Sequence, residues 1–169
     1  MKNLKKLFIA ALFVIGANVS GNAQKIAHIN VYELLSAMPE MKTANDEVKK
    51  AKDKFEKDYQ TMVTELQTKA QKYQTEAPTA GDAVNATREA ELQQSQDRIM
   101  QFQQNAQNEL AKKDETLKTP ILEKAQKAIH KVARAKGYEY VLDSTVGSGV
   151  ILADGPNLME DVKKELAIK

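Results

Sequence analysis

Few residues of this chain combine the types and the spacing that chemistry requires. The two histidines, His28 and His130, lie 102 positions apart, and neither has partners beside it at metal-ligand or proton-transfer spacing. Asp143, Ser144 and Thr145 place an acid next to two hydroxyls, but no base or oxyanion-hole pattern accompanies them. Asp, Ser and Thr side chains favour turns, so we expect these three residues to form one.

We therefore expect structural roles for these groups. His28 is predicted to face the protein body or a subunit interface, and His130, on a lysine-rich helix, to face solvent. Gly147–Gly149 lacks the glycine spacing and the Lys-Ser/Thr of a phosphate loop, and we expect a turn there. The chain has no cysteine, which excludes disulfides, thiolate catalysis and lipidation of an N-terminal cysteine. The sequence thus predicts no enzyme, no metal site and no cofactor.

The N-terminal segment has the organisation of a secretory signal. Three lysines precede the apolar run Leu7–Ala17, whose 11 residues are too few to span a bilayer as a helix. Gly21 and Ala23 supply the small residues of a cleavage site. We predict a signal peptide at residues 1–23 and a soluble periplasmic protein after cleavage; a retained membrane anchor is the alternative.

The remaining residues, 24–169, are predicted to form a single domain. The full chain has a formal charge of +2, but without the three N-terminal lysines it keeps 22 basic and 23 acidic residues, a net charge of −1. This balance gives no electrostatic case for binding nucleic acid or an acidic membrane. With no Trp and only nine Phe or Tyr residues in the full chain, a single compact aromatic core is not expected, and partner subunits would help to bury the core.

Two long helical stretches dominate the sequence, Glu40–Glu76 and Ala83–Thr119. Each would be about 55 Å long at about 1.5 Å per residue. The breaker cluster Ala77–Asp82 separates them, and we expect Pro78 to end the first helix and Gly81 to allow the turn. Because the connection is so short, the two stretches should form an antiparallel hairpin with its tip at residues 77–82.

Each arm of this hairpin has a narrow stripe of apolar and small residues. In the first arm the mean spacing is about 3.6 residues, which predicts a nearly straight helix. Seven glutamines lie between Gln93 and Gln107 in the second arm, which indicates a weakly held, flexible segment. The first stripe comprises Ala44, Val48, Ala51, Phe55, Tyr59, Met62, Leu66, Ala70 and Tyr73; the second comprises Leu92, Ser95, Ile99, Phe102, Ala106, Leu110, Lys113, Leu117 and Ile121.

The chain ends supply a small β-containing body, predicted at residues 25–38 and 121–169. Strands are expected at Lys25–Val31, Tyr138–Asp143 and Gly149–Ala153. Helices are expected at Tyr32–Ala37 and Leu158–Ala167, and a kink at Pro120. Beyond this proline a denser apolar face, from Ile121 to Ala133, should pack in the body. The predicted class is α+β: a long coiled-coil-like helical hairpin on a small sheet.

Three segments have the character of a known family: KIAHINVYELLSAMPEMKTA (Lys25–Ala44), AKGYEYVLD (Ala135–Asp143) and GVILADGPNLMEDVKKEL (Gly149–Leu166). They resemble the OmpH/Skp family of periplasmic chaperones. The resemblance implies a homotrimer in which strands of three chains form a central β-barrel and three hairpins surround a cavity. It also implies an ATP-independent activity, in which the cavity holds unfolded outer-membrane proteins and prevents their aggregation.

The residues themselves are compatible with this fold. A lone three-stranded sheet of this size is marginal and leaves edges unpaired, and both problems would be relieved by trimerisation. The family's arms are strongly basic, whereas Glu65–Leu110 contains four basic and seven acidic residues. A lipopolysaccharide site is therefore not carried over, and client capture should depend on apolar contact.

We predict two sets of functional residues. The candidate client-binding residues lie on the arms, although at helical spacing the aromatic ones and Met62 are expected to pack against the facing arm. The lysine-rich run Lys49–Lys57 is expected to be a solvated face, with a lipid-headgroup site as the alternative. The client set is Phe55, Tyr59, Met62, Leu66, Tyr73, Leu92, Ile99 and Phe102, and the trimer or body set is Ile26, Ile29, Val31, Tyr140, Leu142, Val150 and Leu152.

A structural spacer or adaptor in the cell envelope is the alternative function. An adaptor docking end-on needs a defined tip, and the tip sequence here, Ala-Pro-Thr-Ala-Gly-Asp, is small and has few recognition groups.

Overall fold

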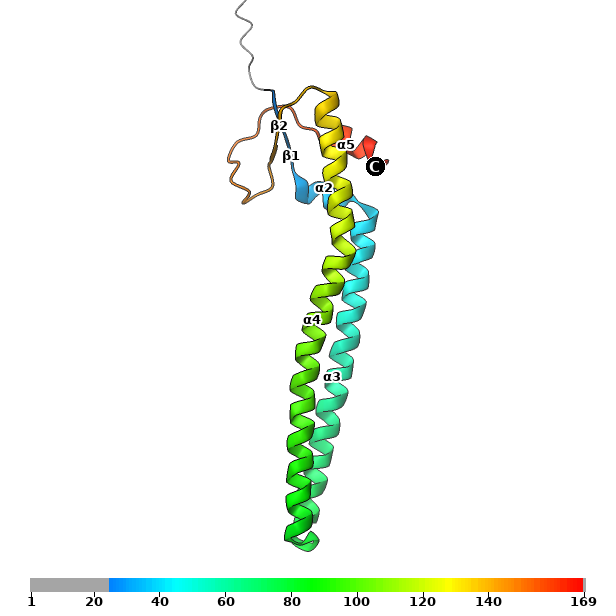
Figure 1. Cartoon of the computed structure of the whole chain (residues 1–169), viewed down its shortest axis with the longest axis vertical. Coiled ribbons are helices and arrows are strands. Elements are labelled where there is room, and N and C mark those ends of the chain that lie inside the picture. Colours follow the sequence, from blue (N-terminus) through cyan, green and yellow to red (C-terminus); the bar gives the residue numbers. More distant parts are fainter. Residues whose placement is uncertain (1–24, 169) are drawn as a thin grey trace, which may run out of the picture.

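The computed structural model describes residues 25–168, and the predicted signal peptide lies outside them. A long helical hairpin projects from a small body built from both ends of the chain (Figure 1). In chain order the elements are β1 (Ile26–Ile29), α2 (Val31–Ala37), α3 (Pro39–Ala80), α4 (Asp82–Ala135), β2 (Tyr140–Asp143) and α5 (Met159–Glu165).

The sheet of the body brings together one strand that precedes the hairpin in the sequence and one that follows it. β1 and β2 run parallel, with Ile26 opposite Tyr140 and Ile29 opposite Asp143. On its other side β1 forms a bridge from His28 to Asn157. The alternation predicted for β1 is confirmed, because Ala27 and Ile29 are buried while Ile26 is exposed.

The sheet has two strands and not the predicted three. Residues 149–153 form no strand, and Ile151 and Leu152 are exposed. The segment is a short apolar run that contains the β-branched residues Val150 and Ile151, which is typical of strands, but a strand also needs hydrogen-bonding partners. Within the described residues the sheet contains only β1 and β2, and residues 149–153 pair with neither of them.

The core of the body lies where α2, the C-terminal part of α4 and α5 meet β1. Leu34 and Met38 are fully buried, as are Leu158 and Val162 at the other end of the chain. The dense apolar face predicted after Pro120 is confirmed, with Leu122 as its one exposed member. Its buried residues are Ile121, Ala125, Ala128, Ile129, Val132 and Ala133.

α3 is slightly longer than the predicted first arm, and α4 extends past the predicted second arm into the body. α3 contains 42 residues and α4 contains 54, which correspond to about 63 and about 81 Å at about 1.5 Å per residue. The prediction that Pro78 ends the first helix is wrong: α3 continues through it to Ala80. A proline in the last turn removes only one helical hydrogen bond, and its fixed φ is helical.

Gly81 alone separates the two helices. Its φ of 80° and ψ of 160° lie in a region that is essentially restricted to glycine. α4 is likewise continuous through Pro120, so the second arm and the body helix are one element. The kink expected at Pro120 stays a prediction.

Candidate functional site

The two arms meet along a seam formed by the predicted stripes. Every member of both stripes is buried or half-buried, so the prediction that they pack against each other is confirmed. Before Pro120 only three residues of the two stripes are buried: Ala44, Ile99 and Ala106. Phe55 and Phe102 pack edge to face, with ring centroids 6.0 Å apart and planes at 71°.

The larger side chains of the seam keep part of their surface in solvent. Two shallow hollows, of about 390 and 280 Å³, flank Phe55 on the hairpin surface. Most candidate client-binding residues are half-buried, and Ile99, at 9% exposed, is the buried exception. The half-buried ones are Phe55, Tyr59, Met62, Leu66, Tyr73, Leu92 and Phe102. The seam is therefore a narrow band of partly open apolar surface along the arms.

Ion pairs between the arms fix their alignment. Near the body, the Lys124 Nζ lies 2.5 Å from a Glu40 carboxylate oxygen, and the Lys113 Nζ lies 3.1 Å from one of Glu47. The hydrogen bond from Lys124 lowers the pKa of the Glu40 carboxyl. These pairs are partly exposed, so each contributes little by itself. Their positions nevertheless oppose sliding of one arm along the other.

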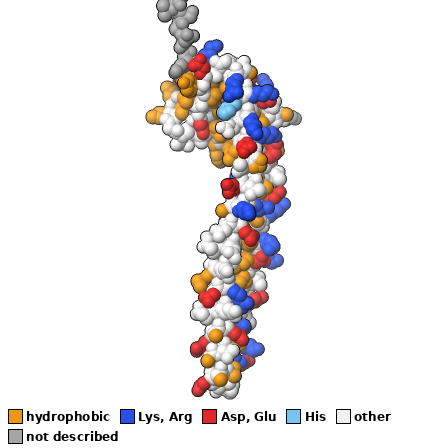
Figure 2. Space-filling model, in the orientation of Figure 1, with side chains coloured by type: hydrophobic (Ala, Val, Ile, Leu, Met, Phe, Trp, Pro, Cys, Tyr) orange, Lys and Arg blue, Asp and Glu red, His pale blue; other side chains and the backbone are white. Residues whose placement is uncertain are grey.

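The lysine-rich face of the first arm is solvated, as predicted. Lys49 pairs with Asp53 at 2.7 Å and Lys54 with Asp58 at 2.8 Å, each one helical turn apart. Figure 2 shows basic and acidic side chains mixed along the arms. The face of the arms seen in Figure 2 thus has no broad region of a single charge sign.

The body exposes apolar side chains on the outer face of its sheet. Ile26, Tyr140 and Leu142 are about half exposed, and Leu152 is more exposed still. Of the other residues predicted for the trimer or body, Ile29 is buried in the chain's own core, and Val31 and Val150 are half-buried. Within the described residues β2 pairs only with β1, so its outer edge is open.

His28 and Asp143 have structural roles. The His28 Nδ1 lies 3.2 Å from the Ser144 Oγ, and its Nε2 lies 3.0 Å from the Gly155 carbonyl oxygen, so the ring fastens both ends of the loop after β2. One Asp143 carboxylate oxygen accepts hydrogen bonds from the Thr145 backbone N at 2.9 Å and hydroxyl at 2.6 Å. The predicted turn is therefore confirmed.

Burial by itself raises the pKa of the Asp143 carboxyl, but the hydrogen bonds from Thr145 and from the Val31 backbone outweigh burial, and the pKa is lowered. His130 is exposed, as predicted. Within residues 25–168 there is no group of three or more His, Asp or Glu that could hold a metal ion. None of the described helices has the length and apolar character needed to cross a membrane.

The profile of the family described as "Outer membrane protein (OmpH-like)" matches residues 25–166. The chain belongs to this OmpH-like family. A solved structure from Caulobacter crescentus CB15, described as a candidate outer membrane chaperone (OmpH-like), is similar in fold with a TM-score of 0.74. The two are 15% identical, and the match covers 87% of this chain and 86% of the other. Among curated protein sequences none matches.

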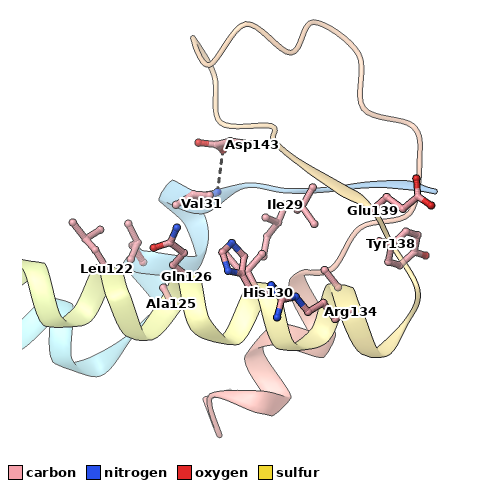
Figure 3. Close-up of a pocket in the computed structure, with 14 residues that line it drawn as sticks. Ile29, Val31, Leu122, Ala125, Gln126, His130, Arg134, Tyr138, Glu139 and Asp143 are labelled. Atoms are coloured by element: carbon pink, nitrogen blue, oxygen red, sulfur yellow. Dashed lines mark hydrogen bonds between the residues drawn. The ribbon is translucent and has the colours of Figure 1, made fainter. Parts of the chain in front are cut away.

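Two features of this OmpH-like chain were missed by the sequence analysis. One is a groove of about 410 Å³ between α4 and the sheet, with apolar walls that include Ile29 and Val141 and with His130 and Arg134 on the α4 side (Figure 3). The stripe pattern of α4 gave no signal for it, because the groove depends on where the sheet docks.

The other missed feature is a cluster of charged and aromatic side chains near the free end of the hairpin, around Tyr73 and Glu91. Alternating charges on the arms were visible in the sequence. Their pairing across the arms depends on the register of the two helices, which the stripes alone do not determine.

Proposed function

We propose that this chain is an ATP-independent periplasmic chaperone that binds unfolded outer-membrane proteins and prevents their aggregation. It acts as a homotrimer in which three hairpins surround a cavity. Membership of the OmpH-like family supports a chaperone function at the family level. The hairpin's geometry supplies the physical basis for the binding itself.

The partly open seam is the observation that carries this proposal. Long, half-exposed apolar and aromatic side chains recur along arms that project freely from the body. Flexible side chains such as Met62 and Leu66 can adapt to many partners, and contacts of this kind require no sequence code in the client. Many such weak contacts around a cavity would hold an unfolded chain without a deep pocket.

Apolar contact is proposed as the main source of attraction between the hairpins and a client. Residues 65–110 carry four basic and seven acidic residues. Two of the four cations are already paired: Lys69 with Glu91 at 3.0 Å, and Arg88 with Glu76. Paired and screened charges contribute little to long-range attraction. Client retention should therefore survive moderate salt.

The exposed sheet face supports the trimer. Ile26, Tyr140 and Leu142 leave an apolar surface on a two-stranded sheet, which is marginal by itself. The open edge of β2 could pair with a strand of a second copy. Residues 149–153, a short apolar run that forms no strand within this chain, are the segment we propose for that pairing.

The proposal is tested by removing apolar surface from the seam without changing charge. In the variant Tyr59→Gln/Met62→Gln, two half-buried members of the client set become polar. The matched control is Thr61→Gln/Thr64→Gln, on the exposed side of the same turns, where both hydroxyls bond to their own helix. We expect the first variant to need several-fold more protein than the control to keep an unfolded outer-membrane barrel soluble.

Circular dichroism and light scattering at fixed chain concentration verify that both variants keep their helices and their oligomeric state. Equal loss of client retention in the two variants would contradict the seam as the contact surface. If only the Tyr59/Met62 variant changed its oligomeric state, these residues would serve assembly instead.

A further inference from the structure

Five side chains form a compact cluster near the free end of the hairpin. Lys69, Tyr73 and Glu76 come from α3, and Arg88 and Glu91 come from α4. We call this cluster the arm-end clasp. The Tyr73 hydroxyl donates to a Glu91 carboxylate oxygen at 2.5 Å, and the Lys69 Nζ lies 3.0 Å from the same oxygen.

Arg88 connects the remaining members of the clasp. Its guanidinium donates to the Glu76 carboxylate and stacks over the Tyr73 ring, 4.7 Å from the ring centroid. Lys69 lies on the same ring at 5.8 Å. One turn closer to the tip, the Asn85 side-chain amide donates to the Ala77 carbonyl oxygen at 3.0 Å. Each of the five residues therefore contacts the opposite arm directly: Lys69 and Tyr73 meet Glu91, and Glu76 meets Arg88.

The clasp lies where the hairpin has no buried apolar core. In the described part of α4 the buried residues begin at Ile99, and in α3 the only buried residue is Ala44. Beyond Ile99 the arms are joined by half-buried side chains only. A free helical end of this kind is expected to fray, because local stability follows buried contacts. Lateral contact through the clasp is what opposes fraying here.

We propose that the arm-end clasp locks the outer end of the hairpin closed in one register and can open without unfolding the body. Charge-assisted hydrogen bonds and cation–π contacts take the place of the missing apolar core. The lock is consequently sensitive to salt, whereas the apolar seam from Ile99 towards the body is not. This inference concerns the hairpin alone and does not depend on client binding.

Hydrogen exchange of the full chain, followed by mass spectrometry, tests the clasp. Glu91→Gln removes a carboxylate that meets Tyr73 and Lys69, and Glu89→Gln removes the charge of an exposed neighbour in the same helix. Arg88→Met breaks the pair with Glu76, and its control is Arg98→Met, whose one side-chain bond is to Ser95 in its own helix. We expect the amides of residues 70–92 to exchange about tenfold faster or more in both clasp variants, as local opening becomes easier.

In both controls the same amides should keep the wild-type exchange rate, and residues 26–38 should stay protected in all variants. Rapid, fraying-type exchange at residues 70–92 in the wild-type chain would overturn the proposal. Equal acceleration by the clasp variants and their controls would also overturn it, because it would reflect helix composition and not the clasp. Loss of protection at residues 26–38 in a clasp variant would show that the end does not open independently.

Discussion

Phe55 of α3 and Phe102 of α4 meet edge to face, with ring centroids 6.0 Å apart. This pair is the one aromatic contact between the arms in the described chain, and it lies next to the buried Ala106. Edge-to-face packing aligns the positive ring edge of one residue with the negative face of the other. The two rings therefore join the arms in the part of the hairpin where glutamines dominate the second arm.

Removing either ring should weaken the hairpin. We expect Phe55→Ala and Phe102→Ala each to lower the free energy of unfolding by about 2 kcal/mol, less than for a fully buried Phe because both rings are half-exposed. The double variant should reveal a coupling of about 0.5–1.5 kcal/mol. Urea unfolding at fixed chain concentration measures the cycle. Strictly additive losses would show that the ring contact contributes nothing of its own.

The body should be far more sensitive to truncation at α2. Leu34 is 0% exposed and lies in the core, whereas Tyr32, two residues earlier, is 70% exposed. Leu34→Ala should cost about 2–5 kcal/mol, since it leaves a cavity in the core. Tyr32→Ala is the control and should leave the urea midpoint nearly unchanged. A comparable loss of stability from both substitutions would contradict this, because the exposed face of α2 would then contribute as much to stability as the buried face.

The hairpin turn should depend on Gly81. A Cβ at Gly81 would meet no atom within 4 Å, so any penalty comes from the backbone conformation alone. We expect Gly81→Ala to cost about 1–3 kcal/mol of local stability. The effect should appear as faster hydrogen exchange at residues 76–86. Gly155→Ala, where the added Cβ also meets open space, is the control and should change nothing there.

Acid should loosen contacts between elements before it unfolds the core. The hydrogen bond from Lys124 lowers the pKa of Glu40 below its ordinary value of 4.5, and that from Lys136 lowers the pKa of Asp161 below 3.8. A lowered folded-state pKa adds stability that is complete above the ordinary value and is lost as pH falls through the folded-state value. Stability should thus fall below about pH 4.5 and continue to fall below about pH 3.8.

Urea midpoints measured across this pH range test the acid effect. Glu40→Gln should reduce the loss of stability that begins below about pH 4.5. Glu33→Gln, a substitution in the neighbouring helix α2, is the control and should leave this loss unchanged. A midpoint that stays constant through this range would contradict the assigned roles of both carboxyls.

The same lowering of pKa occurs at Glu91, where the Tyr73 hydroxyl is the largest cause and Lys69 the next. Lys69 pairs with this carboxylate, and the nearby charge of Arg88 also lowers its pKa. Exchange at residues 70–92 should therefore accelerate as pH falls through the lowered value, after correction for intrinsic exchange. Glu91→Gln should abolish this pH dependence, and Glu89→Gln should retain it.

Periodicity together with the short connection was enough to predict the hairpin, because an apolar stripe repeated over many turns must be covered and the other arm is the nearest surface. Helix ends were less predictable. Proline usually stops a helix, yet Pro78 and Pro120 lie inside helices. At Pro78 the helix ends soon afterwards, and Pro120 lies between Leu117 and Ile121, which both pack in the core of the body. Tertiary contact thus outweighs the local penalty of proline.

The third strand could not be decided from the sequence. Residues 149–153 have the apolar and β-branched composition of a strand, but composition does not determine pairing, and in this chain they pair with neither β1 nor β2. The arm-end clasp could not be predicted from the sequence either. Its members are 22 residues apart between Lys69 and Glu91, and only the turn at Gly81 brings them together.

The central claim is that partly open apolar arms hold unfolded outer-membrane proteins. The most direct test is light scattering after a urea-unfolded outer-membrane β-barrel is diluted into buffer with increasing amounts of the chain. We predict suppression of aggregation that saturates near three chains per client and persists in moderate salt. Suppression that is lost in moderate salt would contradict the proposal that apolar contact is the main attraction between chaperone and client. No suppression at any ratio would contradict the chaperone function and favour a structural spacer.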